Sequence, residues 1–281
     1  MKRLVILLAA TLLPIFASAQ AQINTKKVKI SDFTSKITKV VLTGSDFYDA
    51  ALKDEIKARW RVSPYEFCTF EEFENLRNDS NYYFLLTTNA MFKKESEPGL
   101  DVLTLVKGGT GATINSMLEI VYLPFASTED PSGRELTFLP AFLDIIQEHT
   151  LNSMDKDING YTGLSNYTLN MAKAANMTLV FSEDDLSNEI TGEFRDLNFD
   201  SDMLIMDEDD ADEYISGNAS NALVSYIVTP SDPKPGSYCY KMLINAQTHE
   251  LYYFRRHKIS KKFGAGFLAE DIKRINSYRG R

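Results

Sequence analysis

The chain holds only two cysteines, three histidines and one tryptophan in 281 residues. Two cysteines cannot form the disulfide framework that holds many small secreted domains together. Cys68 and Cys239 both lie in apolar, strand-like segments, where buried free cysteine is common. An oxidising compartment would still permit a bridge. The sequence favours two free thiols and leaves their pairing open.

Catalytic motifs are also missing. None of His149, His249 and His257 has a metal-ligand partner at a useful spacing, and we expect His149 near a helix end, where its charge would suit the helix dipole. The patterns G-x-S-x-G and H-E-x-x-H are absent, and so is a reactive-cysteine signature. A non-enzymatic protein is therefore favoured, although catalytic groups that meet only in space leave no motif.

Positive charge is in deficit, with 30 Lys and Arg against 39 Asp and Glu, or a net charge of −9. This acidic balance argues against nucleic-acid binding, which needs a basic footprint. Apolar runs of membrane-spanning length are absent after residue 16, so we expect a soluble mature protein with no membrane span.

The N-terminus has the three regions of a secretory signal peptide. Lys2 and Arg3 are positive, Leu4–Phe16 is apolar but shorter than the roughly 20 residues of a spanning helix, and Ala17–Ala19 offers small residues to a signal peptidase. We expect cleavage after Ala19, which removes 19 of 281 residues and leaves 262. The predicted location is periplasmic or secreted. Losing Lys2 and Arg3 changes the net charge from −9 to −11.

The remaining chain is long enough for one large domain or two ordinary ones, and its composition is that of a folded globular protein. Self-comparison indicates an internal repeat, with offsets of 141 and 142 residues for the second and third of the four matched pairs. The matched segments are Val40–Thr43 with Thr178–Phe181, Glu71–Phe73 with Asp212–Tyr214, Tyr83–Thr87 with Ser225–Thr229, and Phe138–Ala141 with Gly266–Ala269.

Each half reads strand, helix, strand, short helix, three strands, helix. The first helix is expected at Ser45–Trp60, capped by Ser45 or Asp46 and with Leu52, Ile56 and Trp60 on one face. Its counterpart is expected at Glu183–Phe194. The last two strands of each half are expected at Asp101–Lys107 and Met117–Phe125, and at Tyr238–Asn245 and Glu250–Ile259.

This order predicts an α+β fold, two tandem related repeats that each form a mixed sheet with packed helices. The predicted organisation is a signal peptide (1–19), a first repeat (20–152), a polar linker (153–172) and a second repeat (173–281). The order of elements resembles small α/β envelope domains of the CsgG, LpoB and TolB-N-terminal kind. Some of those proteins assist secretion or cell-wall synthesis by binding partners, so the resemblance implies a binding role.

Charge is spread unevenly along the second half. Residues 183–213 carry fourteen acids and one base, and residues 255–281 carry nine bases and two acids. A charged partner is one interpretation, and we favour the other, in which the two segments face each other or are solvated. The densest acidic run, 207–213, also suits a helix N-terminus, where the dipole favours acids.

A calcium site is one candidate. The segment Asp155–Tyr161 matches the start of a calcium loop, D-x-D-x-N-G, with oxygens from Asp155, Asp157 and Asn159 and the backbone carbonyl of Tyr161. The twelfth position is Asn166 instead of the expected glutamate. An ordinary turn suits the same residues, so calcium remains a hypothesis and no other cofactor is expected.

Two further features have competing interpretations. The glycine-rich segment 107–113 lacks the phosphate-loop spacing, and we interpret it as a hairpin connection. Tyr82–Phe84 and Tyr252–Phe254 alternate across strand faces. One face would be core, and the other either forms an aromatic patch for protein or glycan binding or is covered as well.

The leading functional hypothesis is a non-enzymatic binding or assembly protein of the cell envelope with a protein or glycan partner. The alternatives are an envelope hydrolase with its site between the repeats, and a calcium-stabilised binding module. A pocket with convergent polar groups and perturbed pKa values would favour the enzyme, and a flat apolar patch would favour partner binding.

Overall fold

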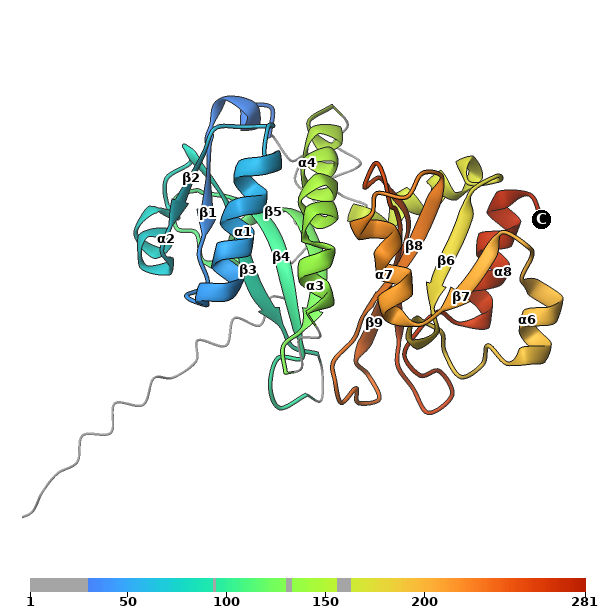
Figure 1. Ribbon diagram of the computed structural model, residues 1–281. Coiled ribbons are helices and arrows are strands. Elements are labelled where there is room, and N and C mark those ends of the chain that lie inside the picture. Colours follow the sequence, from blue (N-terminus) through green and yellow to red (C-terminus); the bar gives the residue numbers. More distant parts are fainter. Residues whose placement is uncertain (1–29, 93–94, 130–132, 156–162) are drawn as a thin grey trace, which may run out of the picture.

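The computed structural model describes residues 30–92, 95–129, 133–155 and 163–281. These residues form two mixed five-stranded sheets with packed helices, which confirms the predicted α+β class. Figure 1 shows the first unit in blue and green beside the second in yellow to red. Within the described ranges, no helix is long and apolar enough to cross a membrane.

The first sheet has the strand order β2-β1-β3-β4-β5. Strand β1 runs parallel to β2 and β3, and the later pairs are antiparallel. The strands are β1 (Ile37–Val41), β2 (Tyr65–Cys68), β3 (Tyr82–Ala90), β4 (Leu100–Lys107) and β5 (Leu118–Ser127). The helices are α1 (Asp46–Arg59), α2 (Phe70–Leu76), α3 (Arg134–Thr137) and α4 (Leu139–Asp155), with short 3₁₀ helices η1 (Phe33–Ser35) and η2 (Ile114–Ser116).

The second sheet repeats this topology, with the order β7-β6-β8-β9-β10 and the same parallel and antiparallel pairs. Its strands are β6 (Thr178–Ser182), β7 (Met203–Met206), β8 (Ala222–Val228), β9 (Tyr238–Asn245) and β10 (Leu251–Lys258). Its helices are α6 (Gly192–Asn198), α7 (Glu208–Ser216) and α8 (Ala269–Arg279), with 3₁₀ helices η3 (Gly163–Lys173) and η4 (Glu183–Asp185). The two similar units fit the duplication that self-comparison predicted.

Helix α1 forms where its apolar spacing predicted, and Leu52, Ile56 and Trp60 are buried. The start of the helix differs from the prediction, because Ser45 occupies the N-cap position without a side-chain capping bond. The carboxylate of Asp49 instead accepts the backbone N–H groups of Thr43 and Gly44, each at 2.9 Å. A side chain from the first turn of α1 therefore holds the loop that precedes the helix.

The helix predicted at Glu183–Phe194 is wrong. The segment begins with the single 3₁₀ turn η4, continues through a β-bridge at Leu186 and a turn at 188–189, and becomes helical only at α6. Leu186 forms a β-bridge with Phe267, and the Ser187 N–H donates to the Phe267 carbonyl at 3.1 Å. Pairing with a segment about 80 residues away thus replaces the local helical bonds.

One hydrophobic cluster spans both units, so the two repeats share a core. It joins Val40, Leu105 and Phe142 of the first repeat to Val224 and Met242 of the second, among others. Helix α4 lies at the centre of Figure 1 between the sheets, and apolar side chains around most of its circumference are buried. A helix that is apolar on several faces is one enclosed by the fold.

The predicted linker begins with the last residues of α4, and its other described part belongs to the 3₁₀ helix η3, which packs along β10. The Thr168 hydroxyl donates to the Phe254 carbonyl at 3.0 Å and accepts from the Phe254 N–H at 3.2 Å. Leu164 and Met171 are buried beside it. The segment is therefore ordered against the second sheet, and the exact domain boundaries remain a prediction.

Candidate functional site

The side chain of Arg134 joins the two repeats. Gly133, with a φ of +87°, turns the chain after β5 into the short helix α3, and Arg134 is the first residue of that helix. A left-handed backbone at this turn favours glycine. The guanidinium group points from α3 into the second repeat, and only 5% of the Arg134 side chain is exposed.

Three acceptors from the second repeat receive the guanidinium hydrogens. Arg134 Nε donates to both carboxylate oxygens of Asp212 at 2.8 and 2.9 Å. Arg134 Nη1 donates to Asp185 at 2.9 Å, and Nη2 donates to the backbone carbonyl of Ser225 at 2.9 Å. Glu208 adds a longer ion pair at 3.6 Å. Such a fork-shaped set of bonds matches guanidinium geometry and could not be reproduced by lysine.

Burial and charge act in opposite directions on this cluster. Burial opposes the charge of Arg134, but the carboxylates of Asp185 and Asp212 raise its pKa above the ordinary value. Burial raises the pKa of Asp212 to about 6, against the opposing effect of Arg134. Burial and the neighbouring carboxylates of Asp185 and Asp184 also raise the pKa of Glu208. The cluster therefore has more negative charge than one guanidinium neutralises.

The carboxylate of Asp185 is also held by a hydrogen bond within the second repeat. The Ser225 hydroxyl donates to Asp185 at 2.5 Å and accepts the backbone N–H of Ser182 at 3.0 Å. Asp185 closes the turn η4 directly after β6, while Ser225 lies on the neighbouring strand β8. Arg134 also stacks over the Tyr226 ring at 5.0 Å. We name Arg134, Asp185, Glu208, Asp212 and Ser225 the junction cluster.

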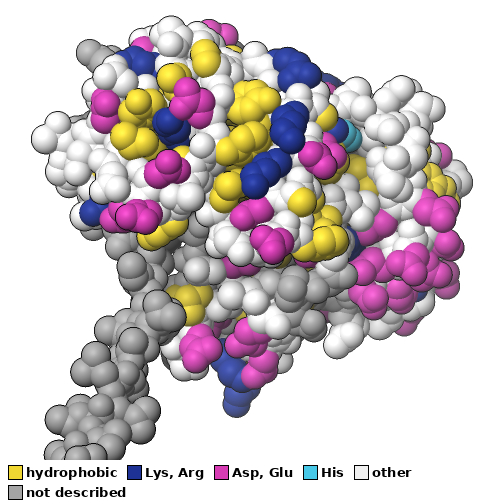
Figure 2. Space-filling model, turned by 60° about the vertical axis from the view of Figure 1, so that its left-hand side comes forward, with side chains coloured by type: hydrophobic (Ala, Val, Ile, Leu, Met, Phe, Trp, Pro, Cys, Tyr) yellow, Lys and Arg dark blue, Asp and Glu magenta, His cyan; other side chains and the backbone are white. Residues whose placement is uncertain are grey.

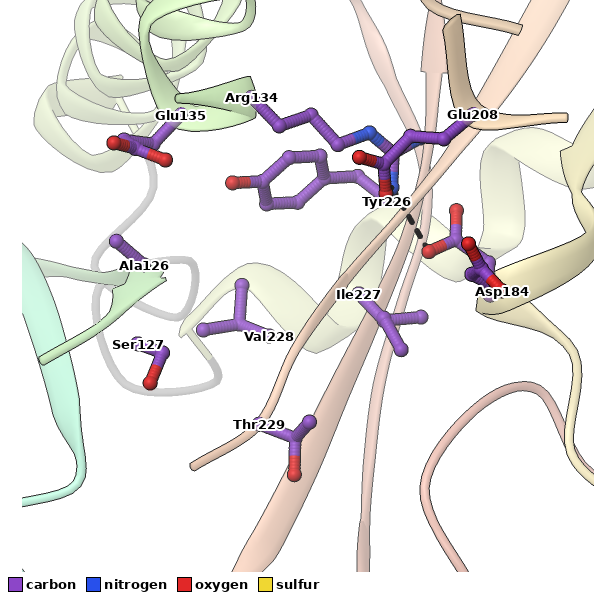
Figure 3. Close-up of a pocket in the computed structure, with 11 residues that line it drawn as sticks. Ala126, Ser127, Arg134, Glu135, Asp184, Glu208, Tyr226, Ile227, Val228 and Thr229 are labelled. Atoms are coloured by element: carbon purple, nitrogen blue, oxygen red, sulfur yellow. Dashed lines mark hydrogen bonds and ion pairs between the residues drawn. The ribbon is translucent and has the colours of Figure 1, made fainter. Parts of the chain in front are cut away.

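A small pocket of about 150 Å³ opens beside the junction cluster. Figure 3 shows its walls, with α3 above, the end of β5 at the left, Glu208 and Asp184 at the right, and the end of β8 below. The pocket is lined by Ala126, Ser127, Arg134, Glu135, Asp184, Asp185, Glu208, Tyr226, Ile227, Val228 and Thr229. Two repeats thus contribute to one cavity.

The pocket lining is acidic and has unused hydrogen-bonding capacity. It holds four carboxylates and one guanidinium, and that guanidinium donates to Asp212, to Asp185 and to the Ser225 carbonyl of the protein itself. The buried hydroxyl oxygens of Ser127 and Thr229 have no hydrogen-bond partner among the described residues. About 38% of the Glu208 side chain is exposed. A buried hydroxyl without a partner is costly, so a bound group that supplies one is favoured.

The chemistry of this pocket suits a cation with hydrogen-bond donors. Its volume is below the roughly 300–1,000 Å³ of sites that enclose whole small molecules. It is closer to the size of one extended amino-acid side chain. Carboxylate and hydroxyl oxygens are acceptors, and an ammonium or guanidinium group has only donors.

A second hollow of about 1000 Å³ is open and mostly apolar, and it lies beside the terminal strand β2. Leu151 on α4 is 40% exposed there. Its lining is Thr34, Trp60, Arg61, Val62, Ser63, Pro64, Tyr65 and Leu151. Nearby, the Arg61 guanidinium donates to the carbonyls of Lys57 and Ala58 in the last turn of α1 and to the carbonyl of Trp60, its C-cap.

The calcium candidate falls mostly outside the described residues. Asp155 is the exposed last residue of α4, while Asp157, Asn159 and Tyr161 lie in the segment 156–162, which the structure does not describe. Elsewhere in the described chain, no group of three or more His, Cys, Asp or Glu side chains is placed to hold a metal. The calcium hypothesis stays a prediction.

The structure also shows where the acidic run, the glycine-rich segment and the two cysteines lie. The acidic run starts α7, where Asp207 caps the backbone N–H of Asp210 at 2.9 Å, as the helix interpretation predicted. The glycine-rich segment connects β4 and β5. Cys68 and Cys239 are both buried and free.

The strand aromatics are covered on both faces. Tyr83, Phe84 and Tyr253 are fully buried, Tyr252 and Phe254 keep less than a tenth of their surface, and Tyr82 is half-buried. The interpretation with both faces covered is therefore correct, and these residues form no exposed aromatic patch.

The prediction for His149 is wrong. It lies inside α4 with 1% exposure, and burial lowers its pKa to about 4, so the ring is neutral and gains nothing from the helix dipole. His249 instead bonds Asp144 at 2.7 Å, beside the Arg59–Asp144 ion pair. That contact links the β9–β10 turn to α4.

Sequence reasoning missed Arg134, the centre of the junction cluster. One signal was present, because Arg134 is the sole Lys or Arg between residues 108 and 155. A lone base in a long segment that is otherwise neutral or acidic is a candidate for a specific buried partner.

Comparisons with known proteins found no matching family model, no similar curated protein and no similar solved structure. Function is therefore argued from the site alone.

Proposed function

We propose that the protein is an exported, non-enzymatic binding module of the cell envelope whose junction pocket receives a cationic side chain of a partner protein. The observation that carries this proposal is the cavity between the repeats, lined by four carboxylates and by two residues whose buried hydroxyl groups have no partner among the described residues. The carboxylates line a space of side-chain size, and Arg134, the base that lines it, is bonded to the protein's own carboxylates.

Charge supports the choice of a cationic partner. The carboxylates of Asp184, Asp185 and Asp209 all raise the pKa of Glu208, so an added positive charge would relieve repulsion that the free protein carries. An arginine or lysine side chain entering between the repeats would contact both of them at once. Buried anchor residues of this kind dominate the affinity of many protein interfaces.

The test is crosslinked capture of partners with the mature 262-residue chain and two matched variants. Glu208→Gln removes a carboxylate that lines the pocket, while Asp209→Asn removes the neighbouring charge on α7 that does not line it. We expect a partner band that Glu208→Gln loses and Asp209→Asn keeps. Equal capture by all three proteins would show that the pocket is not the binding site.

The export half of the proposal rests on the N-terminal sequence. Expression of the full chain in a Gram-negative host should yield a periplasmic or secreted product that begins at Gln20, which N-terminal sequencing would establish. A cytoplasmic product that keeps Met1 or Lys2 would contradict it.

A hydrolase remains a second candidate, and one observation favours it. Burial, followed by the neighbouring carboxylates, raises the pKa of Glu208, and its side chain is partly exposed in the pocket, as a general acid requires. Hydrolysis of peptide, ester or glycoside substrates by the mature chain, abolished in Glu208→Gln and kept in Asp209→Asn, would select the enzyme. The small volume of the pocket favours binding.

Calcium stabilisation is proposed only for the segment Asp155–Tyr161. Calorimetric titration of the mature chain with millimolar calcium should give heat that Asp155→Asn diminishes. The absence of heat would remove this proposal and leave the junction pocket unaffected.

A further inference from the structure

The C-terminal end of β10 and two loops at one end of the second sheet carry five basic residues. The first loop connects β8 to β9, and the second connects β10 to α8. Both project beyond the strands at the lower end of the molecule in Figure 1. We name the following residues the basic tip: Lys234, Arg256, Lys258, Lys261 and Lys262.

Backbone hydrogen bonds hold the two loops to each other. The Gly236 N–H donates to the Ile259 carbonyl at 2.9 Å, and the Ile259 N–H donates to the Ser237 carbonyl at 2.8 Å. The His257 ring nitrogen lies 2.7 Å from the Gly264 carbonyl. The loops therefore form one surface.

The charge of the basic tip is largely without counter-charge. Arg256, Lys258, Lys261 and Lys262 have no ion pair among the described residues, and all four are exposed. Lys234 pairs with Asp232, and both of those side chains are exposed by half or more. Residues 251–269 contain no Asp or Glu.

Other bases of the C-terminal segment behave differently, which sets the tip apart. Arg279 and Arg281 form ion pairs with Asp200 and Asp202, and Arg274 pairs with Glu270. The basic and acidic segments thus face each other in part, as the sequence predicted. Apart from Lys273 on α8, the bases of residues 255–281 without an ion pair in the described chain all belong to the tip.

Aromatic rings lie against two cationic side chains of the basic tip. Arg256 stacks over Tyr238 at 4.8 Å and donates to the Tyr240 hydroxyl at 3.3 Å. Lys262 lies over the half-buried ring of Phe263 at 4.9 Å. A cation held over an aromatic ring is positioned before any ligand arrives.

We propose that the basic tip binds the anionic surface of a lipid bilayer. The bases come from the end of β10 and from two neighbouring loops that project at one end, which suits a flat array of phosphates better than a single bound molecule. The rest of the chain is acidic, since the whole carries −9. An anionic surface would repel the acidic α7 region and attract only the tip, so binding would also orient the protein.

Vesicle sedimentation tests this inference independently of the pocket. The mature chain is mixed with phosphatidylcholine vesicles, with or without phosphatidylglycerol, at low salt and at about 0.5 M salt. We expect binding only to the anionic vesicles and its loss at high salt, because surface charges are screened over a few ångströms there.

The triple variant Lys258→Gln, Lys261→Gln, Lys262→Gln should weaken partitioning by about 100-fold, at roughly fivefold for each base near the surface. The matched control changes three bases elsewhere, Lys53, Lys57 and Lys173, to Gln and should bind like the wild type. Equal loss in both triple variants, or no binding to anionic vesicles at low salt, would overturn the proposal. Tip-dependent binding to polyglutamate or heparin without vesicle binding would overturn it in favour of another polyanion.

Discussion

Arg134 is the residue on which the contact between the repeats most depends. Arg134→Met should lower the free energy of unfolding by about 3–5 kcal/mol, because the carboxylates of Asp185 and Asp212 lose the only counter-charge that the described residues place against them. Arg134→Lys should recover part of that loss, since lysine keeps the charge but not the fork. Urea denaturation at pH 7 measures both.

Arg195→Met is the control for that experiment. Arg195 is 30% exposed and pairs with the exposed Glu183, so its loss should cost no more than about 1 kcal/mol. If Arg134→Met cost no more than Arg195→Met, the junction cluster would not stabilise the fold.

His149 should make the protein sensitive to acid. Its pKa is about 4 in the folded protein, below the ordinary value of 6.5 for an unfolded chain, because burial opposes protonation. The unfolded chain therefore takes up a proton first, and stability is lost as the pH falls from about 6.5 to 4. The full loss at the lower pH is about 3 kcal/mol.

His149→Leu should flatten this part of the pH profile, measured by urea midpoints between pH 7.5 and 4. The neutral ring has no well-formed hydrogen bond among the described residues. Replacing it with leucine therefore breaks no hydrogen bond and should not lower the stability at pH 7.5. Parallel profiles for the two proteins would contradict the assignment.

The roles of some single residues could be predicted from the sequence, and the roles of others could not. The buried face of α1 followed from spacing alone, because Leu52, Ile56 and Trp60 recur at helical intervals. The role of Arg134 did not, because its partners Asp185 and Asp212 lie 51 and 78 residues away. Local pattern contains no information about such a pairing.

At the scale of elements, the close approach of the segment after η4 to the segment before α8 depends on one glycine. Gly266 has a φ of +95°, and a Cβ there would lie 2.6 Å from the Ser187 backbone nitrogen. Gly266→Ala should therefore lower stability by at least about 2 kcal/mol through backbone strain and a clash. Thermal unfolding would measure this.

Gly280→Ala is the matched control for the glycine test. Gly280 also has a positive φ, +77°, but a Cβ there would meet nothing within 4 Å. Its loss should be limited to about 1 kcal/mol from the left-handed backbone. Equal losses at the two glycines would remove the argument for close packing at Ser187.

The same segment shows why element prediction failed at one place. Strands with strong β patterns, such as Leu251–Lys258, formed where expected. The Glu183–Phe194 segment did not form the expected helix, because Leu186 pairs with Phe267 instead. A tertiary bridge had overridden local helical preference.

For the whole molecule, the shared core predicts one cooperative unfolding transition. Trp60 is the single tryptophan, and it is buried in the first repeat, so its fluorescence reports on that repeat alone. Far-UV circular dichroism reports on both repeats. The two signals should coincide in urea. A second dichroism transition without a fluorescence change would mean that the repeats unfold separately.

The order of elements predicted the duplication, but it did not predict how the repeats pack. That arrangement depends on α4, which has apolar residues on faces that serve both sheets. Figure 2 shows a further consequence at this scale, with acidic side chains gathered on the side of the molecule where the second repeat lies. The junction pocket opens among the acids that begin α7 and end β6.

The central claim is that this pocket binds a cation, and NMR titration of the mature chain with n-butylguanidinium tests it most directly. We predict backbone amide shifts confined to the pocket walls, at Ser127, Ile227, Val228 and Thr229, that Glu208→Gln weakens and Asp209→Asn does not. Shifts spread over the acidic surface, or equal in both variants, would mean only diffuse attraction and would contradict the account.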